Sequence, residues 1–426
     1  MQAPRPPVFT TLQLRNIRCF KDTDVPIHPR MTVIIGGNGS GKTTIVEALA
    51  SLTHGDEEGL AKFPLRRGTS NGEVVLLEKA VPAARWTNRS RKRLPSERYL
   101  FAYGRYRRVF DPDVEHTSGS DDLSTLHAHA SRDRATTLRR PDNNLFADLS
   151  RYLTTLHGAI KGDPRLATVW QKLNDSLQGL GTGITEIRIT RGRNQMIPVV
   201  VRNGMELELG ELSDGYQAFL VIVFDLLLRY PYLFPELDEP LNGAAVVVID
   251  EVDLHLHPRW QRTVIRQLFD LFPNTQFVLT THSPGVLQGA IDMDDASVVI
   301  LDENANDNAV TARKLSPKLT KSLRGAEIGS LLVEDKLFKV PSRYSPEMGD
   351  VEQEVDGLQA KVADGSATDD DMAELSQHLR TFQKLVSDED VRRADTSNVS
   401  KISGLQEEFA QSLLHELREL KKAKET

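Results

Sequence analysis

The sequence predicts an α/β fold: a mainly parallel sheet flanked by helices, an antiparallel β subdomain, a helical lobe and a C-terminal α-helical tail. The first observation is a strand–helix alternation in the second half of the chain, which is typical of parallel strands covered by helices. The second is a set of three short alternating runs between residues 184 and 209, split by Gly192 and Gly204, which indicates an antiparallel meander. The alternation consists of the strand 244–249, the helix 260–272, and the strands 277–281 and 297–301.

Strands also open the chain. Apolar and β-branched runs over 8–17 and 31–36 are separated by turn-prone Asp and Pro residues, which predicts two strands. The apolar spacing becomes helical after Gly41, and further strands are expected at 72–81 and 99–103. A strand and a helix therefore enclose the glycine-rich segment that ends at Gly41.

The middle of the chain and its tail are expected to be mostly helical. Residues 109–145 are polar and predict long loops, whereas the apolar spacing over 145–180 is helical and gives the lobe. Two apolar helical faces over 351–362 and 372–386 predict a helical hairpin, and a last helix is expected over 402–422. The predicted domains are 1–319, with an inserted basic, loop and helical region over about 82–180, and the helical region 320–426.

The composition indicates a soluble globular protein. Of the 426 residues, 39% are apolar and 27% are charged, unlike the composition of disordered chains. The single cysteine, Cys19, excludes internal disulfides and a cysteine-based zinc site. The longest apolar run, 218–228, is interrupted by Asp225 and is too short to cross a bilayer, and the N-terminus lacks the apolar segment of a signal peptide. We therefore expect a cytoplasmic protein without a membrane partner.

Charge is unevenly distributed along the chain. The net charge of −7 argues against a uniformly basic nucleic-acid binder, yet residues 85–108 are strongly basic and residues 347–374 are strongly acidic. Because arginine and lysine contact phosphates, DNA binding through Arg85–Arg108 is one interpretation, and a solvated loop is the other. The basic residues of this segment are Arg85, Arg89, Arg91, Lys92, Arg93, Arg98, Arg105, Arg107 and Arg108.

The glycine-rich segment is a P-loop. Residues 36–43 read Gly-Gly-Asn-Gly-Ser-Gly-Lys-Thr, between a predicted strand and a predicted helix, which is the context in which this pattern binds phosphates. Glycines let backbone N–H groups turn towards phosphate oxygens, and the helix directs its positive end at the same anion. Lys42 is expected to bridge the β- and γ-phosphates of ATP, and Thr43 to bind Mg²⁺. The expected nucleotide-binding residues here are Gly36, Asn38, Gly39, Ser40, Gly41, Lys42, Thr43 and Thr44.

Two carboxylates follow the predicted strand at 244–249. Asp250 is expected to complete the Mg²⁺ shell with Thr43, mostly through water, because this hard cation prefers oxygen ligands. Glu251 is expected to accept the proton of the attacking water, as the catalytic base. A solvated strand end or a helix cap is the structural alternative for such a pair.

Two further segments are candidate anion contacts. Ser213 lies at the start of an apolar helix, and Gly215 permits a close backbone approach, so this helix start is a second anion site, although capping alone explains the same pattern. His282, in the Thr-Thr-His-Ser-Pro segment 280–284, is placed to hydrogen-bond a γ-phosphate and is a catalytic candidate. A lone histidine is more often structural.

In this order, the four elements resemble the P-loop, signature, Walker B and switch-histidine motifs of ABC-type ATPases. The signature departs from Leu-Ser-Gly-Gly-Gln, because Asp214 replaces the first glycine and Tyr216 precedes the glutamine. The segments 12–20 and 249–258 resemble those of the RecF and SMC-related branch, which acts on DNA. The resemblance covers roughly residues 9–315.

The resemblance implies a homodimer, or a higher even-numbered homo-oligomer, that sandwiches ATP between protomers. Ser213 and Gly215 of one protomer would contact the γ-phosphate held by the P-loop of the other, and residues 253–257 would cross the seam between them. The Q-loop glutamine of the family has no identifiable counterpart. Tyr103 and Gly104 stand at about its position.

The overall plan resembles the compact ATPases of bacterial anti-phage systems, such as the PtuA subunit of Septu, which works with an HNH nuclease, and the OLD-like ATPases. This implies an ATP-hydrolysing subunit of a defence or DNA-processing complex that regulates a separate effector, either a nuclease or a toxin. Residues 331–335 resemble the opening of a Toprim nuclease only faintly. The alternatives are a RecF-like repair ATPase that binds duplex DNA directly, and an ATP-bound scaffold with slow turnover whose acidic tail is a docking surface.

Overall fold

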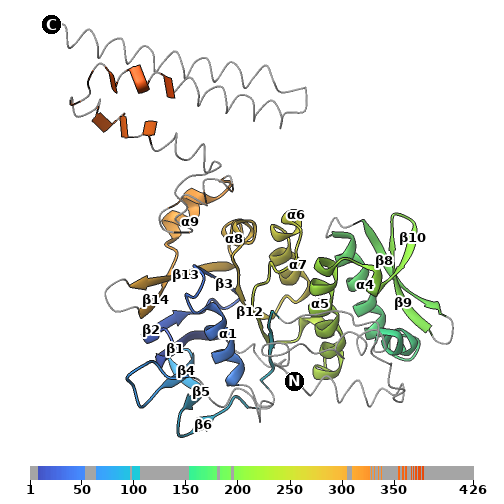
Figure 1. Ribbon diagram of the computed structural model, residues 1–426. Coiled ribbons are helices and arrows are strands. Elements are labelled where there is room, and N and C mark those ends of the chain that lie inside the picture. The colour runs from blue at the N-terminus through green and yellow to red at the C-terminus, as the bar shows by residue number, and fades with distance from the viewer. Residues whose placement is uncertain are drawn as a thin grey trace. The chain divides into compact units, whose positions relative to one another are not determined.

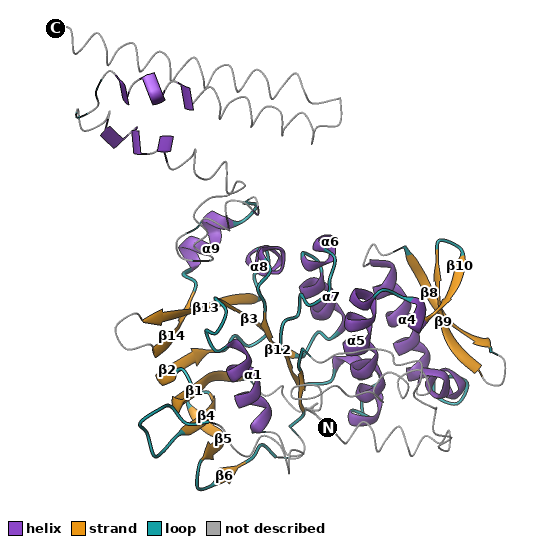
Figure 2. Cartoon of the chain, viewed as in Figure 1, coloured by secondary structure: helices purple, strands orange, loops and turns teal. Residues whose placement is uncertain are grey.

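The computed structural model describes residues 8–52, 64–95, 98–105, 153–179, 183–192, 196–304 and 309–326, with scattered positions between 328 and 378 (Figures 1 and 2). The chain divides into two compact units, Met1–Lys339 and Val340–Thr426. The loops predicted at 109–145 and the helix predicted at 402–422 lie outside the described residues.

A six-stranded sheet organises the first unit. Its strands are β3 (Met31–Gly36), β7 (Leu100–Tyr103), β11 (Val246–Ile249), β12 (Gln276–Thr280), β13 (Ala296–Asn304) and β14 (Ala309–Lys314). Their order in space is β14-β13-β3-β12-β11-β7. All neighbours from β13 to β7 pair in parallel, and the edge strand β14 pairs antiparallel with β13. The predicted mainly parallel sheet is therefore confirmed.

Side chains of this sheet alternate between two buried cores. In β3, Val33 and Ile35 belong to one core and Ile34 to the other. In β11, Val247 and Val248 are divided in the same way. Because successive side chains point to opposite faces of a strand, both faces of the sheet are covered, and this is why its strands are continuous apolar runs.

One face of the sheet is covered by a helix and an antiparallel sheet. The helix is α1 (Lys42–Ser51), and the strands are β1 (Phe9–Ile17), β2 (Phe20–Pro26), β4 (Glu73–Glu78), β5 (Val81–Thr87) and β6 (Arg91–Lys92), in the order β2-β1-β4-β5-β6. Ile45 and Leu49 of α1 share a core with Leu14 of β1 and Leu76 of β4. This packing holds α1 between the two sheets.

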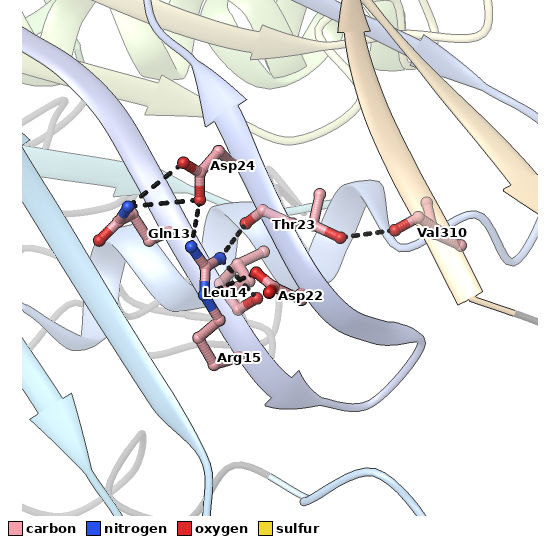
Figure 3. A network of polar contacts seen from close by, with 7 residues as sticks. All are labelled: Gln13, Leu14, Arg15, Asp22, Thr23, Asp24 and Val310. Atoms are coloured by element: carbon pink, nitrogen blue, oxygen red, sulfur yellow. Dashed lines mark hydrogen bonds and ion pairs between the residues drawn. The ribbon is translucent and has the colours of Figure 1, made fainter.

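Polar contacts tie the antiparallel sheet to the central one (Figure 3). Arg15 of β1 pairs with Asp22 at 2.7 Å and with Asp24 at 2.6 Å, and so joins β1 to β2. The buried Thr23 hydroxyl of β2 donates to the carbonyl oxygen of Val310 in β14 at 2.7 Å. Strand β2 is thereby fixed beside β14, the edge strand of the central sheet.

The other face carries the helical lobe and the meander. Helices α4 (Pro164–Gly179), α5 (Asp214–Leu233), α6 (Pro258–Gln261), α7 (Val264–Leu271), α8 (Pro284–Ile291) and α9 (Pro317–Leu323) contribute to this side, with the short helices η2 (Leu209–Glu211) and η3 (Pro240–Asn242). Strands β8 (Ile184–Arg191), β9 (Met196–Arg202) and β10 (Met205–Glu208) form the antiparallel sheet, with β8 against α4 (Figure 2). The predicted meander is confirmed.

Helix α5 is the one described helix whose length and composition would allow it to cross a membrane. The segment concerned is Gly215–Leu233, and 89% of its most apolar window is buried inside the fold. Its apolar residues Phe224 and Leu227 belong to the core on the lobe side of the central sheet. The helix therefore forms part of the core.

Two element boundaries differ from the prediction. The strand expected to extend to residue 81 ends at Glu78, because Lys79 and Ala80 have φ angles of 48° and 67° and turn the chain into β5. The helix expected over 260–272 is interrupted between α6 and α7. At that interruption Gly289 of α8 approaches the chain so closely that a Cβ there would lie 2.6 Å from the carbonyl oxygen of Arg262. Packing against α8 thus accompanies the break.

The division between units lies beyond the predicted position near 320. Leu323, Leu331 and Leu337 are buried in the core of the first unit, so residues up to 339 belong to it. Strands β5 and β6 pair into the antiparallel sheet and β7 into the central sheet, so the start of the region predicted as an insertion, 82–180, is built into both sheets. In the second unit, the buried residues Val355, Leu358 and Leu375 share a small core, and the helical hairpin expected there stays a prediction.

Candidate nucleotide site

The candidate residues on β3, β11 and β12 converge at one edge of the central sheet. These strands are parallel neighbours, so their carboxyl ends lie side by side. Lys42 follows β3, Asp250 and Glu251 follow β11, and His282 follows β12. Such an edge is where open α/β sheets bind ligands.

The glycine-rich loop has the backbone shape that a phosphate cradle needs. Gly39 and Gly41 have φ angles of 81° and 93°, which residues with a Cβ rarely adopt. At Gly41 a Cβ would also lie 2.6 Å from the Cys19 Sγ and 2.7 Å from the Phe20 ring. Gly36 ends β3, and Asn38 and Gly39 form the exposed tip of the loop.

Lys42 is buried at the base of this loop. Its ammonium donates to the carbonyl oxygens of Gly36 at 2.8 Å and Gly37 at 2.9 Å. Burial lowers the pKa of Lys42, and the carboxylates of Asp250 and Glu251 oppose that shift. The charged ammonium is therefore held where it faces both the loop and the two carboxylates.

The loop also contains a buried polar atom that suits an anion. Ser40 is 6% exposed, and its Oγ has no hydrogen-bond partner within the part of the chain that the structure describes. A buried hydroxyl without a partner is unfavourable, and a phosphate oxygen would satisfy it. The neighbouring Thr44 hydroxyl accepts from Arg18 at 3.1 Å, and Arg18 pairs with Glu47 at 2.7 Å. The loop thus fits a nucleotide phosphate.

Thr43 and Asp250 form the candidate metal site. The Thr43 Oγ1 donates to the Asp250 Oδ2 at 2.8 Å, and Asp250 is 1% exposed. Among the described residues, no group of three or more His, Cys, Asp or Glu side chains could hold a metal alone. One hydroxyl and one carboxylate suit Mg²⁺, which keeps several waters and uses substrate phosphates as further ligands. The residues therefore fit this cation.

Two threonines, the last residue of β12 and the residue after it, hydrogen-bond the segments that meet at this edge of the sheet. The Thr280 Oγ1 donates to the Asp250 Oδ1 at 2.6 Å and accepts from the Glu251 N–H at 2.8 Å. The Thr281 Oγ1 donates to the Asp253 Oδ1 at 2.5 Å and accepts from the Ser283 N–H at 2.9 Å. Sequence reasoning assigned no role to either threonine. The available signal was two hydroxyl residues at the end of an otherwise apolar strand.

His282 lies beside the same charges. It is solvent-exposed, but the surrounding protein and the Lys42 ammonium lower its pKa, and Asp253 opposes this shift. The next residue, Ser283, caps α8 by accepting from the N–H groups of Gly285 and Val286. The neutral imidazole is therefore favoured near pH 7, on a backbone that the cap of α8 holds in place.

Ser213 and Gly215 are not brought to the loop that contains Lys42. Ser213 is exposed at the N-cap of α5, and its side chain does not cap the helix. A Cβ on Gly215 would lie 2.0 Å from the carbonyl oxygen of His255, so α5 begins directly against the segment that follows Glu251. Within the described residues, Ser213 makes no hydrogen bond with residues 36–43. The exposed Ser213 side chain is therefore not among the described contacts of that loop.

A buried polar cluster joins β7 to α5. The Tyr103 hydroxyl donates to Asp225 at 2.6 Å, and the Arg229 Nε donates to the same carboxylate oxygen at 2.8 Å. The Tyr103 carbonyl oxygen accepts from the Asp250 N–H at 2.8 Å. Sequence reasoning placed Tyr103 near the missing Q-loop position but did not connect it to α5, because its partner lies far away along the chain.

Comparisons with known proteins identify a family and several partial relatives. Residues 31–288 match the family model described as "AAA domain, putative AbiEii toxin, Type IV TA system". The chain is 41% identical over 115 residues to a retron Vc95 probable ATPase from Vibrio cholerae, covering 27% of this chain and 22% of that protein. It is 30% identical over 177 residues to a Septu protein PtuA from Bacillus thuringiensis, covering 40% and 43%. It is 24% identical over 328 residues to an OLD nuclease from Thermus scotoductus, covering 64% and 58%.

The chain thus spans less than two thirds of the length of each of these curated relatives. Among solved structures, an Smc head bound to the C-winged helix domain of ScpA covers 74% of this chain and all of its own chain, at 12% identity and a TM-score of 0.47. The family model covers more than half of the chain, including the P-loop, the carboxylates after β11 and His282. The chain therefore belongs to this AAA-domain family, as an ABC-type ATPase of the RecF and SMC-related branch.

Proposed function

We propose that the chain binds ATP with Mg²⁺ at the ends of β3, β11 and β12, and hydrolyses it to ADP and phosphate. The observation that carries this proposal is a set of contacts beside the glycine-rich loop: the Thr43 hydroxyl donates to Asp250, and the Thr280 hydroxyl joins Asp250 to the Glu251 N–H group. Thr43 and Asp250 would hold Mg²⁺, which supplies charge neutralisation for the β- and γ-phosphates. Lys42 would hold the same phosphates, and Glu251 would accept the proton of the attacking water.

The site requires a second protomer. Ser213 is exposed, does not cap its own helix and has no described hydrogen bond with residues 36–43, so its hydroxyl is available to a nucleotide held by another copy. Gly215 lets the start of α5 rest on the segment after Glu251, which places the signature residues beside the sequence expected to cross the seam. We infer a head-to-tail pair with ATP between protomers. His282 would contact the γ-phosphate and report its presence.

We further propose that this ATPase serves anti-phage defence by controlling a separate effector, a nuclease such as an HNH enzyme or a toxin. The retron and Septu relatives support a defence role. The acidic second unit is the proposed docking surface for the effector. The described exposed residues of this unit include three acidic ones, Glu354, Asp370 and Glu374, whose carboxylates lie at the surface. The cytoplasmic location expected above stays a prediction.

Removing residues 340–426 is expected to abolish co-purification with the effector encoded beside this chain, while ATP-dependent thermal stabilisation persists. The cut falls at the division between the units and preserves Leu323, Leu331 and Leu337 in the core of the first unit, whereas a cut at 320 would remove all three. The measurement is affinity pull-down of co-expressed proteins, with the intact chain as reference. Undiminished pull-down by the shortened chain would place the docking surface elsewhere.

A second candidate function, direct DNA binding, is favoured by the β5–β6 hairpin. Arg85 and Lys92 are direct cross-strand partners, and Arg89 at the turn is exposed, as are Arg85 and Lys92. Like charges placed opposite each other are unfavourable unless an anion lies nearby. Arg85 pairs with Glu73, which offsets part of this repulsion. The remaining positive charge suits a phosphate backbone.

If this hairpin binds duplex DNA, the double substitution Arg89→Ala/Lys92→Ala should weaken binding for every sequence tested. It should also make the slope of log affinity against log salt shallower by about 2, since each phosphate contact contributes roughly 0.9. Fluorescence anisotropy between about 50 and 200 mM salt measures both quantities. Arg266→Ala, at an exposed arginine of α7, is the matched control. An unchanged slope would assign the hairpin another use.

A further inference from the structure

Thr280 holds both carboxylate residues of the candidate site from a single position. It is the last residue of β12, between β3 and β11, and it is fully buried. Its hydroxyl donates to the Asp250 Oδ1 at 2.6 Å and accepts from the Glu251 N–H at 2.8 Å. Its carbonyl oxygen accepts from the Val252 N–H at 2.9 Å. One residue therefore binds three consecutive residues after β11.

These bonds determine how the Asp250 carboxylate is oriented. Its Oδ1 accepts from Thr280, and its Oδ2 accepts from Thr43 at 2.8 Å. A buried carboxylate is costly unless its oxygens are hydrogen-bonded, so this arrangement satisfies both oxygens and fixes the plane of the carboxylate. The oxygen that faces Thr43 is the one available to Mg²⁺. Without the Thr280 hydroxyl, the carboxylate would be free to rotate away from the metal position.

The same hydroxyl fixes the backbone of Glu251. This residue has a φ of 48°, a left-handed conformation that is unfavourable for a residue with a long side chain. Such a conformation persists only where surrounding contacts hold it, and here Thr280 accepts from the N–H groups of Glu251 and Val252. The backbone conformation sets the direction in which the Glu251 side chain leaves the sheet.

Packing does not explain a threonine at this position. The preceding residues of β12, Phe277, Val278 and Leu279, are buried and apolar, so valine would continue the strand with nearly the same shape. Thr281 makes the equivalent pair of bonds, but to Asp253 and Ser283. The two neighbouring hydroxyls are therefore directed at different partners, and only that of Thr280 touches Asp250 and Glu251.

We propose that Thr280 is a positioning residue for hydrolysis, acting on the water-activating step by orienting Asp250 and Glu251 rather than by binding nucleotide. This rests on the proposed function. Thr280→Val, which keeps shape and strand propensity, should lower kcat by about 10- to 100-fold, since small misplacements of reacting groups have effects of that size. The Kd for ATP should change by less than about threefold, because residues 36–43 are untouched. Thr280→Ser, which restores the hydroxyl, should recover most of kcat.

Three measurements separate this role from a merely structural one. Thermal unfolding of each variant is followed with and without ATP, and Thr280→Ala replaces valine if valine lowers the melting temperature. Thr280→Val should raise the Mg²⁺ concentration needed for half-maximal turnover, because Asp250 is no longer oriented towards the metal position, whereas Thr281→Val, the same change one residue further, should not. In a Glu251→Gln background, Thr280→Val should cause little further loss, because residues that act through one another are not additive.

The outcomes are distinguishable from failure of the proposed function. A wild-type chain that neither binds nor turns over ATP would overturn the proposed function, and the positioning role with it. If the wild type hydrolyses ATP and Thr280→Val matches its kcat, only the positioning role is wrong. Equal losses in Thr280→Val and Thr280→Ser, or a loss fully additive with Glu251→Gln, would likewise overturn that role.

Discussion

Replacing Glu251 by glutamine is expected to lower steady-state ATP turnover by roughly 10²–10⁴, the usual contribution of a general base, while ATP binding is retained. Glutamine keeps the shape of the side chain and can donate or accept hydrogen bonds, but it cannot take a proton from water. The Thr280 bond to the backbone of residue 251 is kept in this variant, since it involves only the N–H group. The local geometry should therefore survive the substitution.

A coupled phosphate-release assay measures this turnover, and Lys42→Ala is the contrasting variant. Lys42 is buried and its ammonium faces the loop and the carboxylates, so its loss should weaken nucleotide binding itself. Thermal stabilisation by ATP follows the ratio of free ligand to Kd and is about 2.7 kcal/mol at a 100-fold excess over Kd. Glu251→Gln should keep this stabilisation and Lys42→Ala should lose it. An undiminished rate in Glu251→Gln would require another base.

The same assay separates an ATP-hydrolysing subunit from the alternative of an ATP-bound scaffold with slow turnover. A wild-type chain whose turnover already equals that of Glu251→Gln, yet which is stabilised by ATP, behaves as a slow ATP-bound scaffold. A wild-type chain that exceeds the variant by the expected factor uses hydrolysis in its cycle. In either case the Glu251→Gln protein should accumulate as an ATP-bound pair of protomers in size-exclusion chromatography, whereas Lys42→Ala should not.

The parts of the site that lie close together in the sequence could be predicted from it. The loop over 36–43 follows a strand and opens a helix, and Asp250 and Glu251 directly follow an apolar strand, so each pattern contains its own structural context. The convergence of these segments also follows from the strand–helix alternation, because parallel strands end at the same edge. The mainly parallel sheet and the meander were predictable for the same reason.

The contacts between distant segments could not be predicted. Thr280 reaches Asp250 across thirty positions because β12 and β11 are neighbours in the sheet. Tyr103 reaches Asp225 across a still longer separation because α5 shares a core with this face of the sheet. No local spacing encodes that order. The turn at Lys79 and Ala80 was missed for a different reason: it uses positive φ angles at residues that do not favour them, so no Gly or Asn marked it.

Substituting Gly215 by alanine is expected to reduce turnover by about 100-fold or more, with ATP binding intact. A Cβ at this position would lie 2.0 Å from the carbonyl oxygen of His255, so either the start of α5 or the segment after Glu251 must move. The body of α5 is buried in the core and resists displacement, so the shift falls on its first turn and on Ser213. Misplacement by about 1 Å is enough for an effect of this size.

The matched control is Gly158→Ala, the same change at a helical glycine with open space around its Cβ position. It should leave turnover unchanged and, by the higher helix propensity of alanine, should not lower the melting temperature. A Gly215→Ala chain with normal turnover would show that the start of α5 has no part in hydrolysis. Preserved ATP-dependent thermal stabilisation is required for the loss to be assigned to the signature helix.

Mixing two inactive variants tests whether the signature acts on the partner's nucleotide. In a mixed pair of Gly215→Ala and Lys42→Ala protomers, one composite site has both lesions and the other has an intact loop and an intact signature helix. Because Ser213 is exposed and has no described hydrogen bond with residues 36–43 of its own chain, we expect mixing to restore a substantial fraction of turnover. If both functions were needed within one chain, no combination of these protomers would contain a complete site, and the mixture would stay inactive.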